Sequence, residues 1–328
     1  MRIYACPSCH ATAYFSNQRC ICGSTLVYDP ERDAFVPGAQ SCANRAQIGC
    51  NWVAEQAETD LCRSCAMTEV VPDIKQGDNL ALWSRAEASK RWVLATLGRW
   101  VWFTDADTGP NPRFHLLSED TAKGHTNIIM GHQNGLVTIN LAEADPIEEV
   151  RRREALSERL RTMTAHFRHE IAHFLFERLA AAHPGFVGQF KAVFGDPQAD
   201  YGDALKRHYA NGAPADWNDR FITPYASAHA HEDWAETSAH VMHLADMLDS
   251  AVEAGLTLPV LNNLKYDAYA ETDAKALIET AGAYGLALNH VNRSIGHDDI
   301  YPFVHSQTVQ DKLAAAHGWL SGAGLRVE

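Results

Sequence analysis

The 328-residue chain lacks the features that would place it in or across a membrane. It contains no run of about 18 apolar residues, which is the minimum that a membrane-spanning helix needs. The first ten residues, MRIYACPSCH, also lack the apolar stretch of a secretory signal peptide. We therefore expect no membrane partner and a cytoplasmic location.

Positive charge is scarce as well. The chain has 28 Lys and Arg against 41 Asp and Glu, which gives a formal net charge of -13. The segment before residue 76 is not basic either, with six Lys or Arg and eight Asp or Glu. Because an acidic surface repels a phosphate backbone, nucleic acid is a poor candidate for a partner.

Cysteine is absent from most of the chain, since all eight cysteines lie before residue 66. This change in composition is followed by the polar stretch VVPDIKQGDN, which contains Pro72, Gly77 and a residue suited to a helix N-cap, Asp78. We therefore predict a small cysteine-rich module over residues 1–75 and a larger domain over residues 76–328.

The cysteines form two clusters of four. The first contains Cys6, Cys9, Cys20 and Cys22, and the second contains Cys42, Cys50, Cys62 and Cys65. Four thiolates are what a closed, structural zinc site requires. A segment this short buries too little apolar surface to fold firmly alone, and zinc binding worth roughly 10–16 kcal/mol would compensate.

Two alternatives for these cysteines are a disulfide framework and a set of unrelated buried thiols. The reducing cytoplasm disfavours the first, and the clustering disfavours the second. We therefore predict two structural zinc ions. One feature is unusual, because a single residue separates Cys20 from Cys22 where a ribbon knuckle normally has two. Either this knuckle is tighter, or His10 takes part in the site.

Hydrophobic periodicity in the larger domain predicts helices and a few strands, which is an α+β class. The apolar spacing of residues 78–100 fits an amphipathic helix, and TNIIMGHQNGLVTINL fits two strands around an Asn134-Gly135 turn. A helical pattern starts at Asp145-Pro146 and continues to HPG at 183–185, with a break near Ser157. A further helix spans residues 232–255, with Gly255 suited to its C-terminus.

The segment HFRHEIAHFLFE concentrates titratable side chains on an apolar helix. His169, Glu170 and His173 form an HExxH pattern, in which the two histidines project from one helical face one turn apart. Both can bind one zinc ion, and Glu170 can take a proton from a zinc-activated water. The alternative is a pair of satisfied core histidines beside a surface glutamate.

A catalytic zinc site needs a third protein ligand and one open position. The candidates lie in PYASAHAHEDWAETSAH, where Glu232 and Glu236 are one helical turn apart. We predict that Glu232 binds the metal and that Glu236 accepts a hydrogen bond from a ligand histidine, which fixes its tautomer. His229 and His231 are the rival ligands.

Several long segments carry a resemblance to a known family. The segments FRHEIAHF, FGDPQADYGDALKRHY, YASAHAHEDWAETSAH, CANRAQIGCNW and LCRSC resemble a bacterial family of zinc-binding metallopeptidases with an N-terminal zinc-ribbon region. The resemblance covers nearly the whole chain. It implies a zincin-like, mainly helical peptidase domain with a small β-sheet, preceded by a metal-bound module.

The segments around the HExxH pattern also resemble gluzincins of the anthrax lethal factor type. In those proteins a tyrosine precedes the first glutamate of a later Glu-x-x-x-Glu helix by seven residues, as Tyr225 precedes Glu232 here. The resemblance supports Glu232 as a ligand and implies that Tyr225 donates a hydrogen bond to the oxyanion of the reaction.

The expected protein is thus a zinc peptidase with one catalytic and two structural zinc ions and a peptide or protein substrate. A hydrolase of other amide bonds would use the same chemistry. The main alternative is a non-catalytic binding scaffold. The intact water-activating Glu170 argues against a scaffold, which would not need it.

Overall fold

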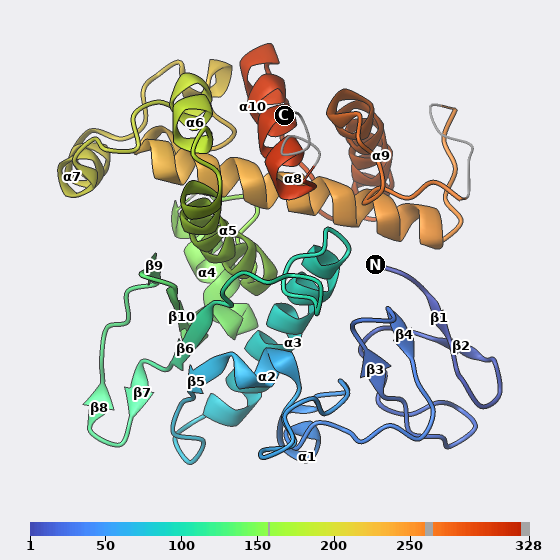
Figure 1. Ribbon diagram of the computed structural model, residues 1–328. Coiled ribbons are helices and arrows are strands. Elements are labelled where there is room, and N and C mark those ends of the chain that lie inside the picture. Colours follow the sequence, from blue (N-terminus) through green and yellow to red (C-terminus); the bar gives the residue numbers. More distant parts are fainter. Residues whose placement is uncertain (157, 260–264, 323–328) are drawn as a thin grey trace. The chain divides into compact units, whose positions relative to one another are not determined.

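The computed structural model describes residues 1–156, 158–259 and 265–322, and it forms two compact units, Met1–Phe174 and Leu175–Glu328 (Figure 1). Helices make up most of the regular structure, and the strands are short. This confirms the predicted α+β class. The boundary between the units falls inside one continuous helix, α5 (Met163–Ala182). In the described part of the chain, no helix has the length and apolar character needed to cross a membrane.

The first unit begins with the cysteine-rich segment. Its regular elements are the hairpins β1 (Tyr4–Ala5) with β2 (Thr12–Ala13) and β3 (Tyr28–Asp29) with β4 (Ala34–Phe35), and the short helices α1 (Arg45–Ile48) and α2 (Arg63–Ala66). Tyr28 is the centre of a small aromatic core, because its ring lies 4.9 Å from Phe15 and 5.7 Å from Trp52. The fold of this segment therefore includes a small apolar core of its own beside the cysteines.

A four-stranded sheet follows. Its order is β5 (Thr68–Val70), β6 (Arg113–Leu117), β10 (Leu136–Asn140) and β9 (Gly131–Gln133). β6 is parallel to β5 and β10, and β9 is antiparallel to β10. Alternate residues are fully buried, as Phe114 and Leu116 are on β6, so one face of the sheet covers the core. A separate hairpin joins β7 (Asp120–Thr121) to β8 (Gly124–His125).

The turn between β9 and β10 has the predicted chemistry. Asn134 and Gly135 both have positive φ, 51° and 76°, as a two-residue hairpin turn with the right twist requires. The two predicted strands are therefore present. β9 lies at one edge of the sheet.

Helix α3 (Asn79–Gly98) occupies the range predicted for it, and its buried face includes Trp83, Val93 and Leu97. Asp78 precedes the helix but makes no side-chain capping hydrogen bond. Helices α1 and α2 both pack against α3. Strand β5 lies within residues 1–75, the predicted cysteine-rich module, yet it pairs with β6 of the predicted larger domain. The boundary predicted between residues 75 and 76 stays a prediction.

The chain then leads to α5 through the 3-10 helix η1 (Leu141–Ala144) and α4 (Pro146–Leu156). The helix start predicted at Asp145-Pro146 is present, and Oδ1 of Asp145 accepts hydrogen bonds from the backbone N–H groups of Ile147 and Glu148. The predicted break near Ser157 falls on a residue outside the described ranges.

The second unit is helical. It contains α6 (Phe186–Phe194), α7 (Tyr201–Asn211), η2 (Trp217–Asp219), η3 (Tyr225–Ser227), α8 (Ala230–Glu253), α9 (Ala274–Ser294) and α10 (Gln307–Leu320). Helix α8 contacts η3, α6, α9 and α10, and Figure 1 shows α6, α9 and α10 along it. The predicted C-terminal glycine, Gly255, has a left-handed φ of 75°. An aromatic cluster of Phe186, Phe190, Phe194, Trp234 and Trp319 fills the core.

Candidate metal centres

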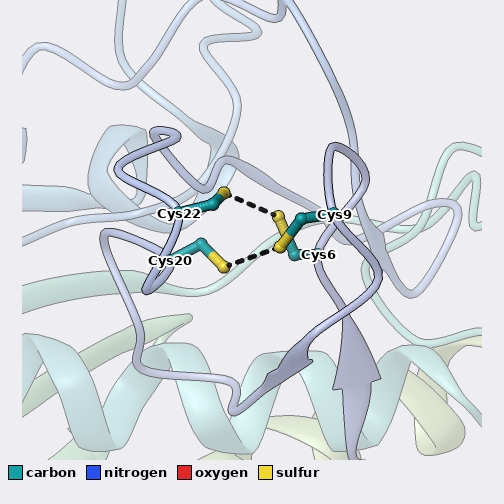
Figure 2. Close-up of side chains that lie close together, drawn as sticks. All are labelled: Cys6, Cys9, Cys20 and Cys22. Atoms are coloured by element: carbon teal, nitrogen blue, oxygen red, sulfur yellow. Dashed lines mark hydrogen bonds between the residues drawn. The ribbon is translucent and has the colours of Figure 1, made fainter.

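The first four cysteines converge at one point, as Figure 2 shows. The Sγ atoms of Cys6 and Cys22 lie 3.9 Å apart, and those of Cys9 and Cys20 lie 3.5 Å apart. Four sulfurs at 2.3 Å from one zinc ion stand about 3.8 Å from each other in a tetrahedron. The cysteines are free thiols, not disulfides, so the donor set and its spacing fit a structural zinc ion.

Each half of this cluster is a short turn. The backbone N–H of His10 donates to the carbonyl of Cys6 at 2.9 Å, and that of Gly23 donates to the carbonyl of Cys20 at 2.9 Å. Gly23 has a φ of 87°, which lets the chain turn tightly after the closely spaced Cys20 and Cys22. The tighter knuckle is therefore the one formed, while His10 is exposed and stands outside the group of four sulfurs.

The second cluster is fully buried. The Sγ atom of Cys50 lies 3.6 Å from that of Cys62 and 3.8 Å from that of Cys65. Backbone N–H groups also point at the sulfurs, since Cys62 N donates to the Sγ of Cys42 at 3.3 Å. Such hydrogen bonds stabilise thiolates, so this group also fits a closed zinc site.

The HExxH pattern lies on α5, and its two imidazoles face each other. The Nε2 atoms of His169 and His173 are 3.2 Å apart. Two nitrogens bound to one tetrahedral zinc ion at 2.0–2.1 Å would stand about 3.3 Å apart. The HExxH spacing therefore places two nitrogen ligands at the separation that one zinc ion requires, without any rearrangement of the helix.

A carboxylate completes this group. His169, His173 and Glu232 each offer one ligand atom, and these atoms all lie within 4.8 Å of one another. Glu232 stands in the first turn of α8 and is 1% exposed. Two imidazoles and one carboxylate are a donor set that zinc accepts while keeping a fourth position open. The residues present thus fit the metal predicted from the sequence.

Apolar contacts fix the orientation of α5. In its first half, the ring of Phe167 packs 5.8 Å from Phe114 of β6. In its second half, the ring of Phe176 packs 4.7 Å from Phe190 and 4.5 Å from His231. These contacts of Phe167 and Phe176 set the direction in which the histidines of α5 point.

A buried carboxylate anchors the first turn of α5. Glu143 of η1 accepts hydrogen bonds from Arg152 at 2.8 Å and Arg161 at 2.6 Å, and its Oε2 lies 3.3 Å from Nε2 of His166. Burial alone would raise the pKa of the Glu143 carboxyl, but hydrogen bonds from His166 and Arg161 hold it well below its ordinary value. His166 is therefore engaged by Glu143.

Two tyrosines lie near Glu232. The hydroxyl of Tyr201, at the start of α7, donates to Oε1 of Glu232 at 2.5 Å. Burial, followed by the negative charge of Glu232, raises the pKa of Tyr225 well above its ordinary value. Tyr225 was singled out from the sequence, but Tyr201 was not. The only sequence signal for Tyr201 was its place in the segment FGDPQADYGDALKRHY.

The rival histidines have other partners. His229 is the N-cap of α8, where its Nδ1 accepts from the N–H of His231, and its Nε2 lies 3.0 Å from the carbonyl of Ala199. His231 stacks on His229 and packs edge-on against Phe176. Neither belongs to the group of three ligand atoms.

Two further side chains near this group have defined surroundings. Glu236 accepts a hydrogen bond from the hydroxyl of Thr223 at 2.8 Å, and its predicted bond to a ligand histidine stays a prediction. On β9, Nε2 of His132 accepts from the N–H of Gly135 at 3.2 Å. Burial and then the charge of His173 lower the pKa of His132 to about 4, so it is a neutral acceptor.

The protein families that match this chain are both described in terms of zinc, in agreement with the sites described above. Residues 79–319 match the family described as "Putative zinc-binding metallo-peptidase", and residues 36–76 match a zinc-ribbon domain. The chain belongs to this metallopeptidase family. It is similar to uncharacterized proteins of Mycobacterium tuberculosis and Mycobacterium bovis, with 39% identity over 97% of this chain and 94% of theirs. No solved structure matches it.

Proposed function

We propose that the protein is a zinc-dependent peptidase of the HExxH gluzincin type. In this proposal His169, His173 and Glu232 hold the catalytic metal, and the two cysteine clusters hold structural zinc ions. The observation that carries it is the convergence of the three ligand atoms within 4.8 Å, in a chain of the metallopeptidase family. The proposed substrate is a peptide or protein.

Zinc bound there would supply a Lewis acid and would lower the pKa of a bound water toward ~7. Glu170 stands next to His169 on α5 and is 7% exposed. In the proposed reaction its carboxylate accepts the proton of the attacking water. It then returns that proton to the leaving amine, as a general base that becomes a general acid.

Tyr225 is proposed to stabilise the oxyanion that forms on the peptide carbonyl. Its raised pKa keeps the phenol protonated at neutral pH, and only a protonated phenol can donate a hydrogen bond. Its location in η3 puts it directly before α8, which carries Glu232.

The sheet edge offers a way to hold an extended substrate. β9 is an edge strand, and its His132 ring lies 5.9 Å from the ring of Phe174 on α5, so β9 runs beside the helix that carries the histidines. We propose that a substrate chain pairs with β9 by backbone hydrogen bonds. The cytoplasm, where the cysteine thiolates would stay reduced, is the proposed location.

Removal and return of zinc tests the proposed function. Hydrolysis of an unbiased peptide library should disappear when a chelator removes the metal from the α5 site and should return when zinc is added. Zinc content and circular dichroism, measured on the same samples, separate loss of the catalytic metal from unfolding of the cysteine clusters. A folded, zinc-loaded protein that cleaves no peptide would contradict the proposal.

A further inference from the structure

The cysteine-rich segment contains an open hollow of about 480 Å³. It is lined by Gln18, Arg19, Thr25, Ala43, Arg45, Ala46 and Gly49. This lining contains two arginines, a hydroxyl and an amide, and it contains no acidic residue. An open concave surface with convergent donors is suited to an anion.

The two arginines of this hollow differ from the other arginines of residues 1–75 in their partners. Other arginines of residues 1–75 have carboxylate partners, such as Arg32 with Asp29 at 2.7 Å and Arg63 with Glu55. Among the residues that the structure describes, no carboxylate lies within 4.0 Å of the Arg19 or Arg45 guanidinium. In a chain with a net charge of -13, two arginines without an acidic partner facing one hollow are a distinct local feature.

The guanidinium of Arg45 is held in place. It donates to the carbonyl of Leu26 at 3.0 Å and to the carbonyl of Gln18. Burial lowers the pKa of Arg45, the charge of Cys50 acts in the opposite direction, and the charge of Arg19 adds a smaller lowering effect, so the two cations repel each other. A bound anion would relieve this repulsion without ordering Arg45 first.

Both walls of the hollow are close in sequence to the cysteine clusters, and the second wall includes α1. Residues 18–25 carry Cys20 and Cys22, and residues 43–49 lie between Cys42 and Cys50. The first wall is a small hairpin, closed by the pairing of Arg19 with Thr25. Its tip carries Ile21, which is 94% exposed. An apolar side chain therefore stands on the same hairpin as the cationic lining.

We propose that this hollow binds a carboxylate of an acidic peptide segment, with an apolar residue of that segment packing on Ile21. A long polyanion such as nucleic acid fits poorly, because residues 1–75 contain more acidic than basic residues and would repel it beyond the hollow. A short acidic segment needs only the local pair of cations. In the proposed peptidase, this site would recruit protein substrates, and it is separate from the catalytic residues. That role rests on the proposed function, and the binding itself does not.

Peptide binding tests the site directly. Fluorescence anisotropy would follow a labelled peptide that contains several glutamates around one leucine, with full-length, zinc-loaded Glu170→Gln protein to prevent turnover. The same peptide with glutamine in place of glutamate is the matched control. We expect the glutamate peptide to bind about tenfold tighter than the glutamine peptide, with an advantage that decreases as salt increases.

Three variants give the test its specificity. Arg19→Glu should abolish the preference for the glutamate peptide, Arg19→Lys should keep part of it, and Arg32→Gln, which removes a charge elsewhere in the segment, should leave it unchanged. Equal binding of the two peptides by the unmodified hollow would overturn the proposal, as would an unchanged preference in Arg19→Glu. Binding of inorganic phosphate without any binding of the glutamate peptide would overturn it in favour of a phosphate site. Hydrolysis of a neutral peptide by the wild type is measured separately, so failure of this site and failure of the proposed function are distinguishable.

Discussion

The hydroxyl of Tyr201 donates a hydrogen bond of 2.5 Å to Oε1 of Glu232, the carboxylate that lies with His169 and His173. Tyr201 begins α7, and Asp200 caps that helix by accepting from the N–H of Asp203 at 2.7 Å. The position of the phenol is therefore fixed by a helix start. A donor on one carboxylate oxygen orients Glu232 and favours the use of the other oxygen for a metal.

Tyr201→Phe removes this hydrogen bond and keeps the ring. We expect the zinc affinity of the α5 site to fall by about tenfold, since loss of a group that orients a metal ligand typically costs 10–100-fold. Competition with a chromophoric chelator measures the affinity. Tyr14→Phe, which changes an exposed tyrosine of the cysteine-rich segment, is the control. An unchanged affinity in Tyr201→Phe would show that Glu232 is oriented by other contacts.

Tyr225→Phe tests the proposed oxyanion donor. We expect kcat to fall by roughly 10²–10³-fold, because one donor to the developing oxyanion contributes about that factor. Zinc content and KM should change little, since the phenol is not among the metal ligands. Equal kcat values in Tyr225→Phe and wild type would remove Tyr225 from the mechanism.

The three groups of converging ligands predict three zinc ions per chain. Glu232→Ala should reduce the zinc content to two, whereas Glu236→Ala, one turn further along α8, should keep three. Cys62→Ser should lose one zinc ion and much of the stability of the cysteine-rich segment, because a structural site contributes on the order of 10 kcal/mol to folding. Elemental analysis of the purified variants measures this. Two zinc ions in the wild type would favour the binding-scaffold alternative.

The second unit should lose stability in mild acid. His240 is fully buried, with its Nδ1 2.8 Å from the hydroxyl of Tyr301, which in turn lies 3.1 Å from Nε2 of His305. Burial lowers the pKa of His240 to about 3, against a smaller opposing effect of Glu236, and lowers the pKa of His305 to about 4. In the unfolded chain both histidines would titrate near 6.5, so the unfolded state binds more protons below that pH. The contribution of these two neutral histidines to the free energy of unfolding is therefore present above pH 6.5 and is lost as the pH falls toward 4.

Urea unfolding at several pH values measures this dependence. Each histidine adds a slope of up to about 1.4 kcal/mol per pH unit, so His240→Gln should reduce the slope of the unfolding free energy between pH 6.5 and 4 by up to that amount. Loss of zinc in acid affects both proteins and cancels in the difference. Parallel pH profiles for the variant and the wild type would show that His240 is protonated within the fold.

The parts of this site that could be predicted from the sequence depend on local geometry. The HExxH spacing predicts two histidines on one helical face, and the Asn134-Gly135 pair predicts a hairpin turn, because in each case the interaction joins residues a few positions apart. The cysteine clusters were equally recognisable. Their grouping in the structure follows the order of the chain, with the first four in one group and the last four in the other.

The remaining features depend on packing between distant segments. Tyr201 reaches Glu232 only because α7 lies near the start of α8, and no pattern in either segment predicts that approach. His229 looks like a metal ligand in the sequence, but the chain uses it as the N-cap of α8. Asp78, in contrast, looks like a capping residue and makes no capping hydrogen bond. In each case side-chain chemistry allowed both roles, and the tertiary contacts select one.

The most direct test of the account compares the wild type with Glu170→Gln, both carrying three zinc ions, on the same peptide library. Glutamine keeps the size of the side chain and its place on α5 but cannot accept a proton from the attacking water. We predict that the wild type cleaves the library and that Glu170→Gln is at least roughly a thousandfold slower with an unchanged zinc content. Equal cleavage by the two proteins would contradict the account.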